Sequence, residues 1–339
     1  METLPPRSLK WFFWLILAAY STFFAEVFAG SDMFPYFNIW GILVVIPIYG
    51  LHTIILTTII FRFGKPTLPV LVFSGMLFGL YEAYMTKVLW QPDWNSFLKI
   101  ADIAVFEVFV LVFWWHTWLS FITPLVLGEQ LLTRSRYVLS GFGEKFQRFF
   151  SSWKGYLVIL LFGGIFQSIN SPSVGRSLLS GVSSVGFLIL LTWLWKRITN
   201  GKEYLLPDLL PDRKEFLVLA IWLAALYLFL GFAMVPERIP GIAGQGLILF
   251  LYLLLVVLLI RALNISRKQN PPEIVPPIIP FKRWLLLWLV FVVTLVAARA
   301  ALGVISNYMA LGFWLAGSVF GIGMFITALK SLGASTVEK

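Results

Sequence analysis

Ten apolar blocks, each long enough to cross a lipid bilayer, dominate this sequence. A transmembrane helix needs about 20 consecutive apolar residues. The blocks span residues 9–29, 38–62, 67–90, 98–122, 154–170, 176–195, 215–235, 242–262, 284–305 and 308–330. In a bilayer the backbone polar groups have to be satisfied within each segment, so blocks of this length form helices. We therefore predict an all-α, polytopic transmembrane helix bundle of about ten helices, forming a single integral membrane domain over residues 1–339.

The basic residues lie almost entirely on one side of these blocks. When alternate loops are assigned to opposite sides, 21 of the 26 Lys and Arg residues fall on one side, and only Lys99, Arg176 and Arg238 fall on the other. Cytoplasmic loops carry the excess of positive charge, which places both termini of this multi-pass cell-membrane protein in the cytoplasm. The net charge of +10 then predicts contacts with anionic lipid at cytoplasmic loops and argues against nucleic acid as a partner.

The first block allows a second interpretation. Arg7 and Lys10 precede it, and Val27-Phe28-Ala29 near its end resembles the cleavage site of a secretory signal peptide. An apolar stretch of about 20 residues is long for the apolar region of a signal peptide, which favours a retained helix. The orientation of the other nine predicted helices is the same in both cases.

Two predicted cytoplasmic loops have patterns of their own. In the loop 133–153, four aromatic residues follow the spacing of one helix face, and basic residues lie elsewhere on the helix; the aromatic residues are Phe146, Phe149, Phe150 and Trp153. This pattern predicts an interfacial helix on anionic lipid. The loop 263–283 contains the segment PPEIVPPIIP at 271–280, which predicts an extended polyproline spacer.

The usual motifs of soluble enzymes are missing from the sequence. It has no G-x-x-x-x-G-K-[ST] phosphate loop, no H-E-x-x-H zinc motif and no G-x-S-x-G nucleophile turn. The chain has no cysteine, so it has no disulfide, thiolate ligand or cysteine nucleophile. We therefore predict neither a cofactor nor a metal. Any chemistry is expected among the ionisable residues of the apolar blocks, which are costly in a membrane.

Eight ionisable residues lie inside or near the ends of the apolar blocks. They are Glu26, His52, Glu82, Lys87, Asp102, Glu107, His116 and Arg299. A rise of 1.5 Å per residue from each block's centre places Glu82, Glu107 and Arg299 in one layer, about 4 to 7 Å toward the outer face. The same rule places His116 about 9 Å toward the inner face, so about 15 Å in depth is expected to separate it from Glu82. His52, about 3 Å inward, is either an ion-binding residue or a hydrogen-bonded core histidine.

Glu82 has the surroundings of a carboxylate that faces protein rather than lipid. Small and polar residues share its helix face, namely Gly75, Gly79 and Thr86. The G-x-x-x-G spacing lets a second helix approach closely. Arg299 lies among small residues in the segment AARAA, which leaves room for a partner helix. We predict that Glu82 or Glu107 pairs with Arg299 and that the other carboxylate titrates. The alternative is that the pair serves only as a structural lock.

The stretch 48–90 resembles a group of uncharacterised prokaryotic polytopic membrane proteins. It reads IYGLHTIILTTIIFRFGKPTLPVLVFSGMLFGLYEAYMTKVLW. In that group, a Tyr-Gly helix that ends near an arginine is followed by a Gly-x-Pro turn and by a helix with G-x-x-x-G and acidic residues. The resemblance implies a polytopic membrane protein and carries no known activity.

A second resemblance is to the CAAX-processing type of glutamic intramembrane protease. The pattern of that family is Glu-Glu-x-x-x-Arg, then Phe-x-x-x-His, then His-x-x-x-Asn. The corresponding residues here are Glu82, Ala83 and Lys87, then Val112 and His116, then Phe166 and Asn170. The resemblance implies that Glu82 activates a water molecule with the help of His116, and that Asn170 helps to hold the oxyanion.

The function that these patterns favour is that of a secondary transporter or other solute-handling protein. Ten helices with little mass outside the membrane suit that class. Glu82 or Glu107 would bind a proton or a cation, and Arg299 would set the charge of the empty site. The solute itself is a small molecule or ion that the sequence does not identify. Two alternatives stay open. One is a membrane-embedded hydrolase or lipid-modifying enzyme that uses Glu82 as general base, and the other is a structural or accessory membrane subunit.

Overall fold

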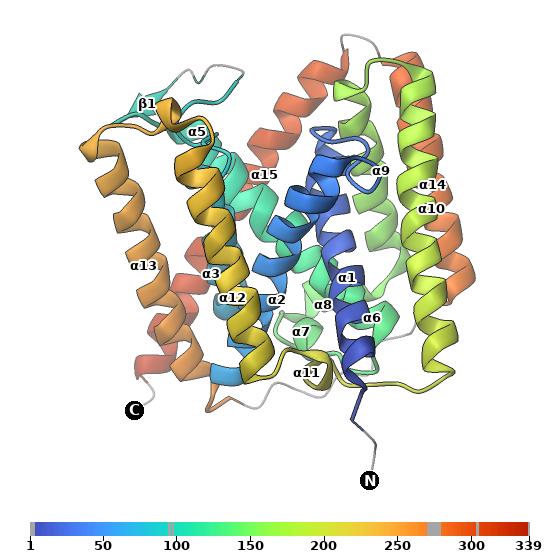
Figure 1. The fold of residues 1–339 in the computed structure, drawn as a ribbon, viewed down its shortest axis with the longest axis horizontal. Coiled ribbons are helices and arrows are strands. Elements are labelled where there is room, and N and C mark those ends of the chain that lie inside the picture. Colours follow the sequence, from blue (N-terminus) through green and yellow to red (C-terminus); the bar gives the residue numbers. More distant parts are fainter. Residues whose placement is uncertain (1–3, 94–95, 97, 270–278, 303–304, 338–339) are drawn as a thin grey trace. The chain divides into compact units, whose positions relative to one another are not determined.

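The protein is helical throughout nearly all of its described length (Figure 1). The structure is a computed structural model and describes residues 4–93, 96, 98–269, 279–302 and 305–337. Within these residues, eight helices are long and apolar enough to cross a membrane: Arg7–Val27, Gly41–Phe63, Val105–Leu132, Val174–Thr199, Arg213–Ala233, Ile242–Ser266, Phe281–Ala301 and Asn307–Gly333. A ninth candidate is a pair of helices, Glu144–Ser151 and Trp153–Asn170, bent by 75° at the break between them. The predicted all-α fold is confirmed.

Each of the ten predicted blocks coincides with a helix, but the third and fourth have different boundaries. The third block, expected over 67–90, gives a shorter apolar helix that ends at Tyr84. The helix of the fourth block, expected over 98–122, spans Val105–Leu132 instead. The apolar residues before it form a hairpin, with β1 (Lys99–Ile100) antiparallel to β2 (Ile103–Ala104). Apolar content therefore marked the segment correctly but did not reveal its conformation.

The chain divides into two compact units. The first comprises residues 1–50, 123–210 and 271–313. Its elements are α1 (Arg7–Thr22), η1 (Phe23–Val27), η2 (Gly41–Val45), the start of α2 (Ile46–Phe63), α6 (Thr123–Leu132), α7 (Tyr137–Ser140), α8 (Glu144–Ser151), α9 (Trp153–Asn170), α10 (Val174–Thr199), α11 (Leu206–Leu209), α14 (Phe281–Ala301) and the start of α15 (Ile305–Val337). Here α9 packs along α14, and a Cβ atom on Gly164 would lie 2.9 Å from the carbonyl oxygen of Phe291. A side chain at that position would force the two helices apart.

The loop 133–153 contains the predicted short helix, α8. Part of its aromatic face packs on the first unit itself. Phe150 is buried, with its ring 6.3 Å from that of Tyr156, and Phe146 stacks on Phe142 at 5.9 Å. The helix is confirmed, while its contact with lipid stays a prediction. The predicted polyproline spacer at 271–280 falls outside the described residues, except for its last two positions.

The second unit comprises residues 51–122, 211–270 and 314–339. Its elements are the remainder of α2, α3 (Leu68–Gly79), α4 (Tyr81–Tyr84), the β1–β2 hairpin, α5 (Val105–Glu107), η3 (Val108–Ile122), α12 (Arg213–Leu228), η4 (Phe229–Ala233), η5 (Pro236–Arg238), α13 (Ile242–Ser266) and the remainder of α15. The core is built on α3, which packs against both η3 and α13. This apolar helix is almost wholly buried, and it leads directly to the residues of the candidate site.

The helix η3 has π-helical geometry over 15 residues. A π-helix bonds each N–H to the carbonyl five residues earlier and is rare beyond a single turn. The side chain of Thr117 follows the same spacing, since its hydroxyl donates to the carbonyl oxygen of Val112 at 2.6 Å. Because π-helical turns are frequent at functional sites, η3 is of particular interest.

Candidate functional site

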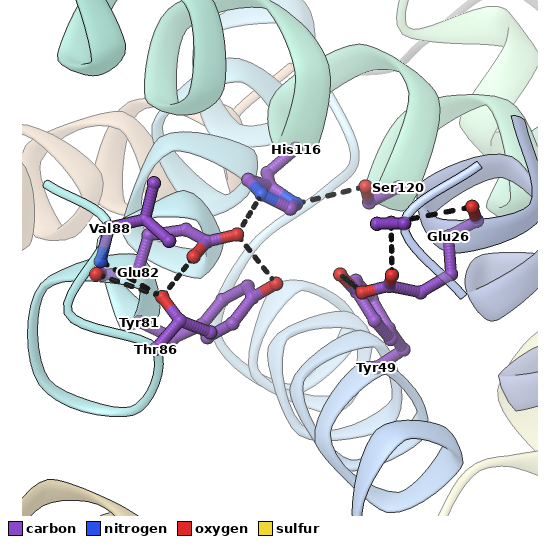
Figure 2. Close-up of polar contacts among 9 residues, drawn as sticks. Glu26, Tyr49, Tyr81, Glu82, Thr86, Val88, His116 and Ser120 are labelled. Atoms are coloured by element: carbon purple, nitrogen blue, oxygen red, sulfur yellow. Dashed lines mark hydrogen bonds and ion pairs between the residues drawn. The ribbon is translucent and has the colours of Figure 1, made fainter. Parts of the chain in front are cut away.

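The carboxylate of Glu82 is the centre of a buried polar cluster in the second unit (Figure 2). Glu82 lies on α4, the single helical turn that follows α3, and its side chain is buried. The hydroxyl of Tyr81 donates to Oε1 at 2.9 Å, and the hydroxyl of Thr86 donates to Oε2. Both carboxylate oxygens thus accept hydrogen bonds from neutral hydroxyl groups of the same short segment.

His116 on η3 completes this cluster. Its Nε2 atom lies 2.7 Å from Oε1 of Glu82, and its Nδ1 atom lies 3.0 Å from the hydroxyl oxygen of Ser120. An ionised carboxylate can only accept hydrogen bonds, so a proton on Nε2 of His116 makes the first contact. In the neutral imidazole, Nδ1 then accepts from Ser120. The result is a row of carboxylate, imidazole and hydroxyl in which each group orients the next.

Two glycines of α3 bring the two helices close enough for this contact. A Cβ atom on Gly75 would lie 2.8 Å from Cα of Thr117, and one on Gly79 would lie 2.9 Å from Cα of Val112. These distances leave no room for a side chain, so the predicted close approach at the G-x-x-x-G face is confirmed. Its partner is the helix that carries His116.

The prediction that about 15 Å of depth separates Glu82 from His116 is wrong. It assumed that the third block is one helix centred near residue 78 and that the fourth is centred near residue 110. The actual helix of the fourth block begins seven residues later and ends ten residues later than expected. His116 is therefore close to the middle of that helix, and π-helical geometry changes the rise per residue as well.

His52, the other histidine of the chain, lies in the same unit and beside the same aromatic side chains. Its Nε2 atom lies 3.0 Å from the hydroxyl of Tyr227, and its ring stacks on Phe78 with 4.9 Å between centroids. Phe78 also stacks on His116 at 5.9 Å, and the ring of Tyr81 contacts both imidazoles. The structure therefore brings His52 to the edge of the Glu82–His116 cluster, with aromatic rings between the two.

Lys87 is buried in the turn that follows α4, outside the candidate spans. Its ammonium donates to the carbonyl oxygens of Leu230 on η4 and of Met234 directly after η4, each at 2.6 Å. Burial lowers the pKa of Lys87 below its ordinary value, an effect that the carboxylate of Glu237 opposes. Lys87 thus ties the segment that carries Glu82 to another helix of the unit.

The remaining predicted residues lie elsewhere. Glu107 is buried on α5 and accepts a hydrogen bond from the hydroxyl of Ser96 at 2.9 Å. Arg299 belongs to the first unit, where it donates to the carbonyl of Pro172 at 3.2 Å, so its pairing with Glu82 or Glu107 stays a prediction. Asn170 also belongs to the first unit and donates to the carbonyl of Ala29 at 2.6 Å. Its predicted role near an oxyanion therefore remains untested.

The first unit contains a buried carboxylate that the sequence analysis missed. Glu129 on α6 is fully buried and accepts hydrogen bonds from the backbone N–H groups of Val138 and Leu139 at the start of α7. Arg136 donates in return to the carbonyl oxygens of Glu129 and Thr133 at the end of α6. This is a reciprocal cap between two helix ends. It was missed because the fourth block was expected to end at residue 122, although the apolar run 125–127 pointed to a longer helix.

Glu26, predicted near the outer headgroups, has hydroxyl partners like those of Glu82. It lies on η1 in the first unit, where Oε1 accepts from the hydroxyl of Tyr49 at 2.6 Å and Oε2 from that of Ser31 (Figure 2). Across the described residues, no group of three or more His, Asp and Glu side chains is placed to hold a metal ion. The carboxylate, imidazole and hydroxyl groups of these clusters are groups that can exchange protons.

Comparison with known proteins identifies the class. Residues 15–338 match an uncharacterized membrane protein family. The chain belongs to this family. An uncharacterized protein of Archaeoglobus fulgidus is 32% identical over 267 residues, which cover 78% of this chain and 82% of the relative. No solved structure matches the chain. The membrane-protein family predicted from residues 48–90 is thus confirmed.

Proposed function

We propose that this protein is a secondary carrier that couples the movement of a small solute to a proton held by Glu82 and His116. The observation that supports it is the buried contact of 2.7 Å between these two side chains. Intramembrane ionisable residues are costly, and in carriers they form proton relays. The carboxylate and imidazole lie on two helices whose contact depends on small residues, so a change in one helix alters the other.

Proton binding would change the direction of one hydrogen bond in this row, the bond between His116 and Ser120. With a neutral imidazole, Nδ1 of His116 accepts from Ser120. A proton added to Nδ1 makes that nitrogen a donor, and the hydrogen of the Ser120 hydroxyl has to turn elsewhere. The imidazolium is stabilised by the carboxylate of Glu82 at Nε2. One proton would therefore reverse the bond at the Ser120 end of the row and place a positive charge beside the carboxylate at the other end.

The proposal includes the orientation and the outer residues predicted from the sequence. The protein would lie in the cell membrane with both termini in the cytoplasm, as the distribution of basic residues indicates. Glu107 would be a second carboxylate on the solute pathway, and Arg299 would set the charge of the empty site. These assignments rest on the sequence.

Proton-coupled flux in liposomes tests the proposal. The purified protein is reconstituted with a pH-sensitive dye inside, and a panel of amino acids, sugars and inorganic cations is added outside. We expect solute-dependent proton flux that is lost in Glu82→Gln and in His116→Gln. The matched control is Glu144→Gln, which removes an exposed carboxylate paired with Arg148 on α8. Solute-dependent proton flux that persists in Glu82→Gln would overturn the proposal, and loss of stability alone would favour the structural lock.

A membrane-embedded hydrolase is the second candidate, because one observation favours it. The resemblance to glutamic intramembrane proteases assigns Glu82 and His116 to a single catalytic step, and the two side chains are in contact. Glu82 would act as general base toward a water molecule. The test is cleavage of a fluorogenic prenylated peptide and of a fluorogenic phospholipid by the reconstituted protein. Turnover that disappears in Glu82→Gln but not in Glu144→Gln would select this candidate over the carrier.

A further inference from the structure

One end of the second unit carries a group of exposed basic side chains, which we call the basic patch. It consists of Arg62, Arg213, Lys214, Arg267 and Lys268. These residues come from three separate parts of the sequence: the end of α2, the start of α12 and the end of α13. All five belong to the same compact unit.

Three hydrogen bonds hold these helix ends together. Arg62 donates to the carbonyl of Pro211 at 2.8 Å, just before α12. Arg267 donates from Nε to the carbonyl of Phe63 at 2.5 Å. The backbone N–H of Lys65 donates to the hydroxyl of Ser266 at 2.9 Å, beside Gly64, where a Cβ atom would lie 2.5 Å from that hydroxyl oxygen. These bonds hold the ends of α2 and α13 and the start of α12 beside one another, so the basic side chains form one continuous surface.

Among the described residues, none of the five side chains of the basic patch makes an ion pair with a carboxylate. The nearest acidic residues along the chain are Asp212 and Glu215, and their carboxylates accept backbone N–H groups in the capping box of α12. Arg62 and Arg267 donate to backbone carbonyls, and Arg62 also lies over the ring of Phe216. These neutral partners leave the positive charge of both arginines available to an external anion.

An exposed apolar surface begins directly beside the patch. On α12, Leu217 and Ile221 lie four and eight residues after Arg213 and are 59% and 61% exposed. On α13, Ile260 and Val257 lie seven and ten residues before Arg267 and are both 53% exposed. At 1.5 Å per residue, this apolar surface extends from about 6 Å to about 15 Å from the charges. A soluble anion would use the charges alone, whereas a phospholipid would use both features.

We propose that the basic patch binds the phosphate of an anionic phospholipid, with the acyl chains lying along α12 and α13. Arg62 and Arg267 are the central ligands, because Arg267 bonds the residue that follows Arg62, and guanidinium groups suit phosphate oxygens. Arg213, Lys214 and Lys268 surround them. This inference does not depend on the carrier function, since it concerns the end of the unit and not the Glu82–His116 cluster.

Native mass spectrometry of the purified full chain tests this proposal. The probes are phosphatidylglycerol and, as the neutral lipid, phosphatidylcholine. We expect the wild type to retain phosphatidylglycerol and Arg62→Gln/Arg267→Gln to bind it about 25-fold more weakly, at about fivefold per basic residue. The matched control is Arg176→Gln/Arg238→Gln, which removes two arginines predicted to lie on the opposite side of the membrane. This control should bind phosphatidylglycerol like the wild type.

A second patch variant and a competition with inorganic phosphate complete the test. Because Arg62 and Arg267 also bond the backbone, Arg213→Gln/Lys214→Gln provides a second variant whose side chains make no such bond among the described residues. It should also weaken binding. Inorganic phosphate in excess should not displace the lipid, and displacement would show that the patch is a site for free phosphate. Equal phosphatidylglycerol binding by the wild type and both patch variants would overturn the proposal.

Discussion

The Nε2 atom of His116 lies 2.7 Å from Oε1 of Glu82, and 34 positions separate the two residues in the sequence. The contact joins the turn after α3 to the middle of η3. Both side chains are buried. The stability of this unit and the protonation of its central cluster therefore depend on the same pair of atoms.

Removing the imidazole should be more costly than removing both members of the pair. His116→Phe leaves the Glu82 carboxylate buried without its imidazole, and we expect a loss of about 3–5 kcal/mol in the free energy of unfolding. Adding Glu82→Gln to that variant removes the buried charge and should recover part of the loss. The measurement is reversible unfolding in mixed micelles titrated with SDS. If the two single losses simply add in the double variant, the residues are not coupled.

Replacing a glycine of α3 should disturb both packing and site. A Cβ atom on Gly79 would lie 2.9 Å from Cα of Val112 and 3.3 Å from Cβ of His116. We expect Gly79→Ala to destabilise the protein by about 1–3 kcal/mol and to shift the infrared bands of His116. The control is Gly246→Ala on α13, where a Cβ atom would meet no atom within 4 Å. Equal stability of the two variants would contradict the close packing of α3 on η3.

Lys87 should make the stability of the protein depend on pH. Lys87→Met removes two hydrogen bonds to the carbonyls of Leu230 and Met234, at an expected cost of about 1.5–3 kcal/mol for bonds from a charged donor. Because burial lowers the pKa of Lys87 in the folded state, the unfolded chain binds the proton more tightly. Stability of the wild type should therefore rise relative to Lys87→Met as the pH increases toward the ordinary lysine pKa of about 10.4. If the stability of the wild type instead falls relative to that of Lys87→Met as the pH rises, the lowered pKa of Lys87 is contradicted.

Glu129 should be important to the stability of the first unit although it is not part of the candidate site. Glu129→Ala leaves the N–H groups of Val138 and Leu139 without their acceptor, and a loss of about 1–3 kcal/mol is expected. Glu144→Ala, which removes an exposed carboxylate, should change stability by less than about 0.5 kcal/mol. Thermal unfolding followed by tryptophan fluorescence compares the two. Equal melting temperatures would show that the reciprocal cap contributes nothing.

The sequence predicted the helical segments well because each block of apolar residues has to satisfy its own backbone in a membrane. It also singled out Glu82 and its glycine face. It failed on the depth of His116, because apolar residues 98–104 could be read as helix when they form a hairpin. Hydropathy also gave no sign of the π-helical geometry of η3, whereas the apolar run 125–127 did point to the helical extension that carries Glu129. Partners across helices, such as the carbonyls that bind Lys87, follow from packing and leave no local pattern.

The π-helical geometry of η3 has a consequence for how related chains are compared. A π-helical turn holds one more residue than the α-helical turn it replaces, so it can arise from a single-residue insertion and vanish with a single deletion. Family members that differ here would show one-residue gaps between positions 108 and 122. Such a gap would rotate everything on one side of it around the helix axis. A one-residue gap in this stretch would therefore decide whether a histidine at the position of His116 still faces the glutamate.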